Sequence, residues 1–481
     1  MKNNSIKKFF SIVIVLSAWA SNAQSKVWTL EECVSYAMEN NISIKASELD
    51  EELANITKKD AIGNFLPSIN ANASHTWNIG LNQDITTGLL RNQTIQFSAV
   101  GMTVGVDIYK GLENQTRLRR ANLSVISSQY QLLKMQEDIG LNVANAYLQI
   151  LFNKENLKVR KEQLAFDLKQ MERTKELLDA GLIPAGDLLD MKATASASQQ
   201  QVTIAENALL ISKLSLAQLL QLKEFRDFDI EDPNYKAEQN ALLLMKPEEI
   251  YEKAKELRTE LKIARTNLEI AEKDIKIAKG AYQPTLQGFY NFNTRSANSD
   301  AISGFQIDSE NPTSPIGFVE GTNQIVLQPN FVPIVGGPVP VMDQFDTNKG
   351  QTIGIQLSVP VFNGFSVRNS VERSKVAYER SKVAYEQQEL DLARNVYTAF
   401  TDATGALNSY EAALETAESR KEAFRYAKER YDVGLLNSFD FNQSQTLYVN
   451  SLSEVLRTKY DYIFRIKILE FYFGIPITQK P

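Results

Sequence analysis

Apolar positions follow a helical period through two long stretches of the chain, from Gly111 to Gly181 and from Gly364 to Gly434. Both stretches lack proline and are rich in residues that favour helix. Along the second stretch, apolar residues recur every seventh position in two stripes, as in coiled coils. One stripe holds Val376, Val383, Leu390 and Tyr397, and the other holds Tyr378, Tyr385, Leu392 and Ala399. Each stretch predicts a helix of about 105 Å, which is too long for a compact globule.

A glycine turn ends each long helical pattern, and a second helical pattern follows each turn. The two stretches have the same length, 70 residues from glycine to glycine. The returning patterns cover residues 187–222 and 439–473. Each half of the chain therefore predicts a long helical hairpin, with Gly181 or Gly434 at its tip.

The two halves of the chain carry the same elements in the same order, which indicates an internal repeat. Both halves open with a helical run, and these runs end at Phe65 and Tyr282. Thr29 with Glu32 fits a helix-capping box, and Pro247 suits a first helical position. The predicted parts of the mature chain are a first repeat, a linker and a second repeat, over residues 24–223, 224–245 and 246–475.

Four short regions replace the helical period with alternation of apolar and polar residues, which predicts β-strands. They cover residues 69–79, 100–108, 285–292 and 352–361. Each has roughly the ten residues with which a tilted strand crosses a bilayer, one face apolar and the other polar. Alternation alone equally fits a small soluble antiparallel sheet with one wet face.

Four strands are too few to close a barrel, and lipid excludes open sheet edges because their backbone groups find no partner there. A four-stranded membrane sheet must therefore be shared between chains, and three copies would give a barrel of 12 strands. The segments that join the strands, residues 80–92 and 293–350, are then extracellular loops. The second is long and rich in Asn, Ser, Gly and Pro. It predicts a partly ordered surface loop that either narrows the mouth or is only a variable external loop.

The first 23 residues have the features of a secretory signal peptide. Lys2, Lys7 and Lys8 precede an apolar segment, and a small-residue cleavage site ends at Ala23. The later sequence has no run of the roughly 20 apolar residues that a membrane-spanning helix needs. Any membrane segment of the mature chain is therefore expected to consist of strands.

Charge and residue content narrow the possible functions. The formal net charge is -6, and an acidic surface argues against a nucleic-acid partner. Cys33 is the only cysteine, so no internal disulfide is expected, and we predict a small, semi-buried residue on an early helix. His75 is the only histidine, and no metal cluster, catalytic triad or phosphate loop is available. We therefore expect neither enzyme activity nor a cofactor.

Several short motifs, in their order and spacing, make the chain resemble the TolC-like outer-membrane efflux family. They are Thr29-Leu30-Glu31-Glu32-Cys33-Val34, Leu66-Pro67, Ala180-Gly181-Leu182 and Tyr431-Asp432-Val433-Gly434-Leu435. The resemblance implies a homotrimer with a 12-stranded barrel in outer-membrane lipid and a helical tunnel through the periplasm. It also implies a periplasmic adaptor that docks at the hairpin tips and an inner-membrane pump that supplies the energy. The tip turns are Gly181 with Leu182 and Gly434 with Leu435.

The resemblance further implies a gate at the tips, held by hydrogen bonds and ion pairs between neighbouring helices. Asp187 and Tyr431 match gate residues of the family, whereas Leu436 stands where the family often has an arginine. Asp440 matches one carboxylate of a ring that lines the pore constriction, and Gln443 replaces the other. Asp187 and Asp440 fit helix N-caps as well, and Tyr431 fits an interhelical packing residue.

The sequence thus predicts a mainly helical protein with four membrane strands per protomer. Its predicted function is the outer-membrane channel of a tripartite efflux or secretion system. The alternative is a soluble periplasmic coiled-coil scaffold or adaptor, which would keep the hairpins but has no use for half-apolar strands. A passive porin would leave the hairpins without a purpose.

Overall fold

The computed structural model describes residues 27–83, 88, 90–223, 228–233, 235, 237 and 240–475. The predicted signal peptide, residues 1–23, lies outside this part of the chain. The chain divides into two compact units, and each unit contains segments from both halves of the sequence. The helical unit comprises the described parts of residues 1–55, 123–271 and 377–481, and the sheet unit those of 56–122 and 272–376.

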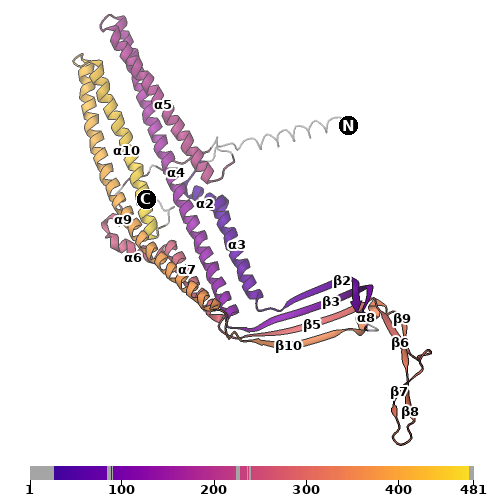
Figure 1. Cartoon of the computed structure of the whole chain (residues 1–481). Helices are drawn as coiled ribbons and strands as arrows, with labels where there is room; N and C mark the ends of the chain where they lie inside the picture. The colour runs from indigo at the N-terminus through magenta and orange to yellow at the C-terminus, as the bar shows by residue number, and fades with distance from the viewer. Residues whose placement is uncertain are drawn as a thin grey trace, which may run out of the picture. The chain divides into compact units, whose positions relative to one another are not determined.

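Two helical hairpins form most of the helical unit (Figure 1). The first consists of α4 (Glu113–Asp179) and α5 (Ala185–Leu219), and the second of α9 (Ser366–Asp432) and α10 (Ser438–Phe473). α4 and α9 each have 67 residues, which confirms the two long helices. Their length is possible because neither span contains the proline that would break it. None of the helices in the described part of the chain has the apolar run that membrane crossing requires.

The predicted helix starts near Thr29 and Pro247 are confirmed. Thr29 accepts a hydrogen bond from the Glu32 backbone at 3.1 Å, and the Glu32 carboxylate accepts one from the Thr29 backbone at 3.0 Å. Pro247 is the first residue of its helix, where a missing N–H costs nothing.

Each opening helical run is broken into two helices, where the sequence predicted one. α2 (Leu30–Asn40) and α3 (Ile42–Gly63) are separated by Asn41, and α6 (Pro247–Leu257) and α7 (Thr259–Gly280) by Arg258. Both break residues have φ −66° and ψ 130°, which is extended backbone. Both are buried. The Asn41 amide donates to the Leu219 carbonyl oxygen at 2.9 Å, and Arg258 pairs with Glu137 at 2.9 Å. These tertiary partners, which come from distant helices, are absent from the local pattern.

The segment predicted as a polar linker, residues 224–245, contributes side chains to the core. In its described part Phe228, Ile230 and Leu242 are buried. β4 (Asp229–Ile230) pairs in parallel with β1 (Val27–Trp28), and a short helix η1 (Ala241–Leu244) follows. Tyr147 donates its hydroxyl to the Glu231 carbonyl oxygen at 2.7 Å. Burial raises the pKa of the Tyr147 phenol, so it keeps the proton for this bond. Cys33 is fully buried in the same core, more deeply than predicted.

The sheet unit contains one four-stranded antiparallel sheet in the order β10-β5-β3-β2. The strands are β2 (Ser68–Gln83), β3 (Leu90–Lys110), β5 (Thr285–Ala297) and β10 (Gly350–Ser358). β2 and β3 are longer than the predicted ten residues, so they take up both ends of the predicted loop 80–92. The predicted strand 352–361 includes Pro360, whereas β10 ends at Ser358, since proline has no N–H for the ladder.

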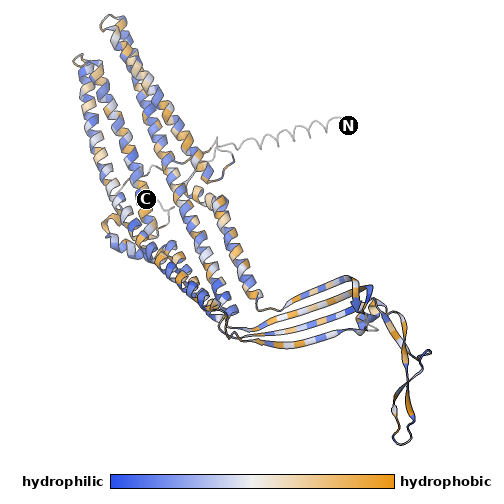
Figure 2. Ribbon diagram, viewed as in Figure 1, coloured by the Kyte–Doolittle hydropathy of each residue, from blue (hydrophilic) through white to orange (hydrophobic). Residues whose placement is uncertain are grey.

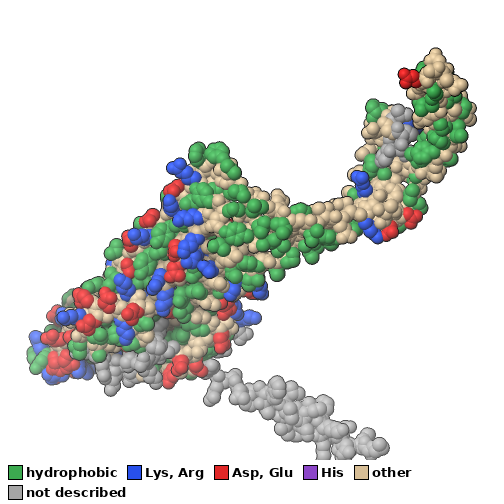
Figure 3. Space-filling model, turned by 90° about the horizontal axis from the view of Figure 1, so that it is seen from below, with side chains coloured by type: hydrophobic (Ala, Val, Ile, Leu, Met, Phe, Trp, Pro, Cys, Tyr) green, Lys and Arg blue, Asp and Glu red, His purple; other side chains and the backbone are tan. Residues whose placement is uncertain are grey.

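The register of this sheet separates an apolar face from a polar face. One row across the four strands is Ile69, Val104, Tyr290 and Ile353, and the next row is Asn70, Thr103, Asn291 and Thr352. Adjacent rows point to opposite faces because side chains alternate along a strand. Figure 2 shows the same alternation of colour along each strand, and Figure 3 shows few charged side chains on this sheet and many on the helices.

The predicted loop 293–350 is folded over most of its length, contrary to the expectation of partial order. β6 (Asp300–Ile307) pairs with β9 (Phe331–Pro338), and β7 (Thr313–Phe318) pairs with β8 (Ile325–Pro329). The short helix α8 (Val341–Thr347) then covers the end of β5 that extends beyond Gly350, the first residue of β10. There the Gln344 side chain bonds both the N–H and the carbonyl of Ala297, at 2.9 and 3.0 Å. An amide side chain thus takes the place of a strand partner.

Candidate functional site at the hairpin tips

Both hairpin tips have the same turn. Gly181 and Gly434 have φ values of 74° and 76°, a left-handed conformation that glycine adopts without a steric penalty. The next residue in each turn donates back to a carbonyl five residues earlier. Leu182 donates to Leu177 at 2.9 Å, and Leu435 donates to Arg430 at 2.8 Å. This pattern is a Schellman motif, which satisfies carbonyls that the helix end leaves without partners.

The helices that leave the two turns are capped differently. α10 has Asn437 as its N-cap, and the Asn437 side chain accepts from the Asp440 backbone at 2.8 Å. The Asn437 amide also donates to the Asp440 carboxylate at 3.0 Å. α5 has Pro184 as its N-cap, with no side-chain capping bond. The N-cap interpretation is therefore wrong for Asp187 and for Asp440, since each lies inside the first turn of its helix.

The structure places Asp187 against the other hairpin and Asp440 against its own. The Ser438 hydroxyl at the start of α10 donates to the Asp187 carboxylate at 3.4 Å. Asp187 is half-buried, whereas Asp440 is exposed. A negative carboxylate in the first turn of a helix is also favoured by the helix dipole.

Tyr431 packs between the helices of the second hairpin. Its ring stacks on Phe441 with 4.5 Å between centroids and 12° between planes. Phe441 is fully buried and also contacts Phe424 and Phe166. The interhelical packing interpretation of Tyr431 is therefore confirmed, while its role in a gate stays a prediction.

The remaining predicted residues lie on the surface of the tips. Leu182 and Leu435 are 70% and 71% exposed. Gln443 is exposed and Leu436 is half-buried. The two exposed leucines stand on equivalent turns, so each tip presents one large apolar side chain to its surroundings.

Among the contacts between the hairpins that the sequence does not predict, two join a carboxylate of one hairpin to a hydrogen-bond donor of the other. The first is an ion pair near the tips, in which Arg173 of α4 bonds Asp432 of α9 at 2.7 Å. Both side chains are partly exposed, and nothing in the local sequence distinguishes them from other surface charges.

The second contact centres on Asp167 of α4, which is fully buried. Its carboxylate accepts hydrogen bonds from Gln163 of its own helix at 2.9 Å, Ser198 of α5 at 2.5 Å and Gln445 of α10 at 2.7 Å. A buried carboxylate needs such donors, because an unsatisfied charge in a protein interior is strongly unfavourable. Three helices and both hairpins therefore meet at this one side chain.

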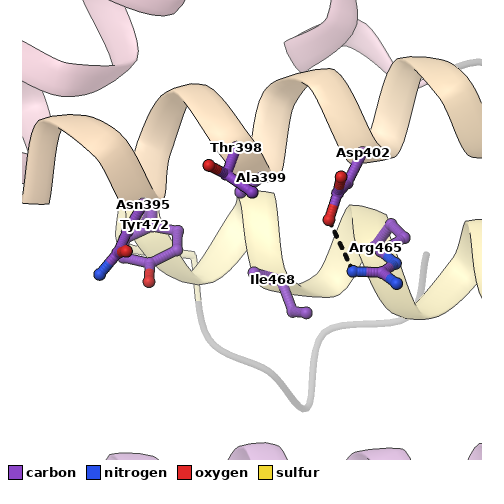
Figure 4. Close-up of a pocket in the computed structure, with 7 residues that line it drawn as sticks. All are labelled: Asn395, Thr398, Ala399, Asp402, Arg465, Ile468 and Tyr472. Carbon is purple, nitrogen blue, oxygen red and sulfur yellow. Dashed lines mark hydrogen bonds and ion pairs between the residues drawn. The ribbon is translucent and has the colours of Figure 1, made fainter. Parts of the chain in front are cut away.

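Away from the tips, α9 and α10 are joined by an ion pair between Asp402 and Arg465 at 2.7 Å (Figure 4). The shallow pocket around this pair is also lined by Asn395, Thr398, Ala399, Ile468 and Tyr472. Since its two charged side chains bind each other, we interpret the pocket as part of the packing interface between α9 and α10. In the part of the chain that the structure describes, no group of three or more His, Cys, Asp or Glu side chains could hold a metal ion.

The chain is similar to known outer-membrane proteins along nearly its whole length. The model of the family described as outer membrane efflux protein matches residues 33–221 and 250–465. Outer membrane protein TolC of Vibrio cholerae is 22% identical over 461 residues, which cover 94% of this chain and 92% of that protein. Outer membrane protein TolC of Escherichia coli is 20% identical over 476 residues, which cover 95% and 84%.

Solved structures show the same fold. The outer membrane protein VceC from Vibrio cholerae matches with a TM-score of 0.72 at 14% identity, over 93% of this chain and 96% of that one. A membrane protein from Pseudomonas aeruginosa matches with a TM-score of 0.73 at 18% identity, over 92% of each chain. The two matched segments of the family model agree with the two repeats that the sequence predicted.

Proposed function

The chain belongs to the outer membrane efflux protein family, and from this premise we propose that three copies form one exit duct. Members of the family are efflux channels of the outer membrane, and this chain is one of them, with a part that extends into the periplasm. The proposed duct has the sheet unit in the membrane and the helical hairpins in the periplasm. A periplasmic adaptor and an inner-membrane pump complete it.

The observation that carries this proposal is the four-stranded sheet with one apolar face and two outer strands, β10 and β2. Such edges are not tolerated in lipid, because their backbone groups would lack partners. If β10 of one copy pairs with β2 of the next, no edge is left. All neighbours in the sheet are antiparallel, so β2 and β10 run in opposite directions and this pairing is antiparallel too.

The apolar face has the height that a bilayer requires. Along β3 it runs through alternate residues from Val100 to Ile108, and β2 carries Ile69, Ala71 and Ala73 beside it. A tilted strand crosses the hydrocarbon with about 9–11 residues. Beyond Val100 the same face becomes polar, where the His75 ring and the Ser98 hydroxyl share a hydrogen bond of 2.8 Å.

The tips are the proposed site of both gating and adaptor docking. In the gate, Asp187 and Tyr431 hold the two hairpins closed, and Leu436 stands at their border. Asp440, with Gln443 one turn further along, lines the constriction, where a ring of charge selects ions by its field. The exposed Leu182 and Leu435, on the glycine turns, are the apolar contacts that a docking adaptor would cover.

The test of the duct is the oligomeric mass and heat-modifiability of protein extracted from outer-membrane fractions with detergent. A trimer that dissociates only on heating supports the shared barrel. A monomer in the soluble periplasmic fraction would support a scaffold or adaptor and would overturn the proposal.

The test of docking is co-purification with the adaptor. Leu182→Asp together with Leu435→Asp should abolish it, because a carboxylate at each tip opposes apolar contact. The matched control is Gln443→Asp, an exposed residue away from the glycine turns. Full adaptor recovery with the double variant would remove the turns from the docking surface.

A further inference from the structure

The segment between β5 and α8 forms one outer ribbon of two antiparallel strands, residues 300–338. Its two parts, β6–β9 and β7–β8, are joined by backbone bonds around Asn330. Asp308 donates to the Asn330 carbonyl at 2.9 Å, and Asn330 donates to the Pro312 carbonyl at 3.0 Å. A two-stranded ribbon is marginally stable by itself in water, so a ribbon of this length indicates a partner.

One face of the outer ribbon is entirely apolar where β6 pairs with β9. The register places Ile302 opposite Val335, Phe305 opposite Pro333 and Ile307 opposite Phe331. The Ile, Val and Phe members of these pairs are between 42% and 66% exposed. Figure 3 shows hydrophobic side chains gathered along the ribbon at the right-hand end of the view. An exposed apolar row of this kind is typical of an interaction surface.

A second apolar surface lies at the outer end of the β2–β3 hairpin. Gly350, the first residue of β10, is level with Asn293 and Gly101, and through them with Asn72. β2 continues past that level to Gln83. On this projecting part Trp77, Ile79 and Leu81 share one face, and they are 59%, 80% and 69% exposed. They lie beyond the polar level of His75 and Ser98, so the lipid-facing band does not account for them.

We propose that the apolar face of the outer ribbon docks on the projecting β2–β3 end of the next copy of this chain. The proposal rests on the proposed trimer. In the chain the ribbon lies between β5 and β10, and α8 ties its base to β5 beside β10. β10 is the edge strand that would pair with β2 of the next copy. The ribbon therefore lies at the boundary between the two copies, close to the exposed Ile79 and Leu81 of the next copy. The three ribbons form a collar at the outer mouth.

The charge of the ribbon favours this occupant over a lipid surface. Between Arg295 and Lys349 the chain has no Lys or Arg, and it has acidic residues at Asp300, Asp308, Glu310, Glu320, Asp343 and Asp346. A purely acidic segment is repelled by the anionic groups of a membrane surface. The projecting part of β2, from Ala73 to Gln83, carries no acidic side chain, so nothing there repels the ribbon.

The test is cross-linking between copies in whole outer membranes, in a Cys33→Ala background. Phe305→Cys combined with Leu81→Cys, treated with a short bismaleimide, should give covalent dimers and trimers. The matched control is Gln306→Cys with Leu81→Cys. Gln306 is the next residue along the strand and pairs with Val332 on the opposite face, so its cross-linking should be absent or much weaker.

The outcomes separate this proposal from the trimer itself. A heat-modifiable trimer that shows no cross-link from Phe305→Cys, or an equal one from Gln306→Cys, overturns the collar and leaves the duct intact. Loss of the trimer in the parent protein overturns both. Quenching of a fluorophore at position 305 by quenchers carried on lipid would assign the ribbon to the membrane and overturn the collar.

A second variant avoids dependence on cysteine chemistry. Phe305→Asp should release the ribbon, so that external protease cleaves it roughly tenfold faster on intact cells, because cleavage follows the population of the open form. Gln306→Asp adds the same charge on the other face and should leave the rate unchanged. Equal rates for the two variants would count against docking through the apolar face.

Discussion

The two hairpin tips have the same backbone and different chemistry. Gly181 and Gly434 adopt nearly the same φ, and both turns close with the same pair of backbone bonds. The residues that follow differ, because α5 starts at Pro184 without a side-chain cap and α10 starts at Asn437 with one. Asp187 and Asp440 stand at the same position of the repeat, but only Asp187 bonds the other hairpin.

This difference shows which features of a repeat are tied to its geometry. A turn of fixed geometry requires glycine and leaves the next residues free to vary, since their side chains do not form the turn. In the second hairpin the N-cap Asn437 binds the Asp440 carboxylate. In the first hairpin the N-cap Pro184 makes no such bond, so the Asp187 carboxylate is available for contact with the other hairpin. The asymmetry of the proposed gate therefore begins with a single capping residue.

The largest expected effect is at Asp167, which the repeat pairs with the exposed Arg420 of α9. Asp167→Ala should lower the free energy of unfolding by about 3 kcal/mol, because it leaves the donors of the buried Gln445 and the half-buried Ser198 without this acceptor. Arg420→Ala should change it by less than about 0.5 kcal/mol. Thermal unfolding of the detergent-extracted protein measures both. Similar losses for the two variants would mean that burial of the carboxylate contributes nothing specific.

The second effect should be the same at both tips. Gly181→Ala and Gly434→Ala should each cost about 1–2 kcal/mol, because a side chain disfavours positive φ. No atom lies within 4 Å of an added Cβ at either glycine, so the cost is that of the backbone alone. Gly405→Ala, in the interior of α9, is the control and should stabilise by about 0.5–1 kcal/mol. Clearly unequal costs at the two turns would contradict their equivalence.

The sequence was informative where local rules determine the structure. Glycine spacing, the absence of proline and period-two alternation predicted the hairpins, their tips and the four strands. The burial of Asp167 could not be predicted, because an acidic residue on a long helix is ordinarily solvated and its partner Gln445 is 278 residues away in the chain. The outer ribbon was missed because glycines and prolines interrupt its alternation. The breaks at Asn41 and Arg258 depend on tertiary partners that no local pattern contains.

The third effect tests whether the contact of Asp187 across the hairpins helps to close the tip. Asp187→Ala should remove about 1 kcal/mol from the closed state, which shifts the open fraction roughly fivefold. Ser438→Ala removes the same hydrogen bond from the other side and should match it. Conductance in planar bilayers reports the shift, and Asp187→Ala with Tyr431→Ala should raise it further. Unchanged conductance in that double variant would remove both residues from the gate.

The fourth effect concerns ion selectivity and the carboxylate that the cap holds. Asp440→Asn keeps an oxygen for the bond from Asn437 and removes one negative charge per copy, so cation preference should weaken while conductance changes little. The reversal potential in a salt gradient measures it. Gln443→Glu adds a charge at the other ring position and should strengthen the preference. An unaltered reversal potential in both variants would place the constriction elsewhere.

The smallest effect is expected at the ion pair of Arg173 with Asp432. It is also the sharpest test of the difference between the two hairpin tips. The repeat places Tyr426 where Arg173 would have its counterpart, so the pair cannot be duplicated on the other side. Both side chains are partly exposed, and a pair of this kind contributes under about 1 kcal/mol. A double-mutant cycle with Arg173→Ala and Asp432→Ala, measured on the stability of the closed state, gives the coupling free energy of the pair. This coupling should nearly vanish near 1 M salt, because charges are then screened within about 3 Å. A coupling that survives high salt would mean that packing at this position, and not charge, holds the two hairpins together.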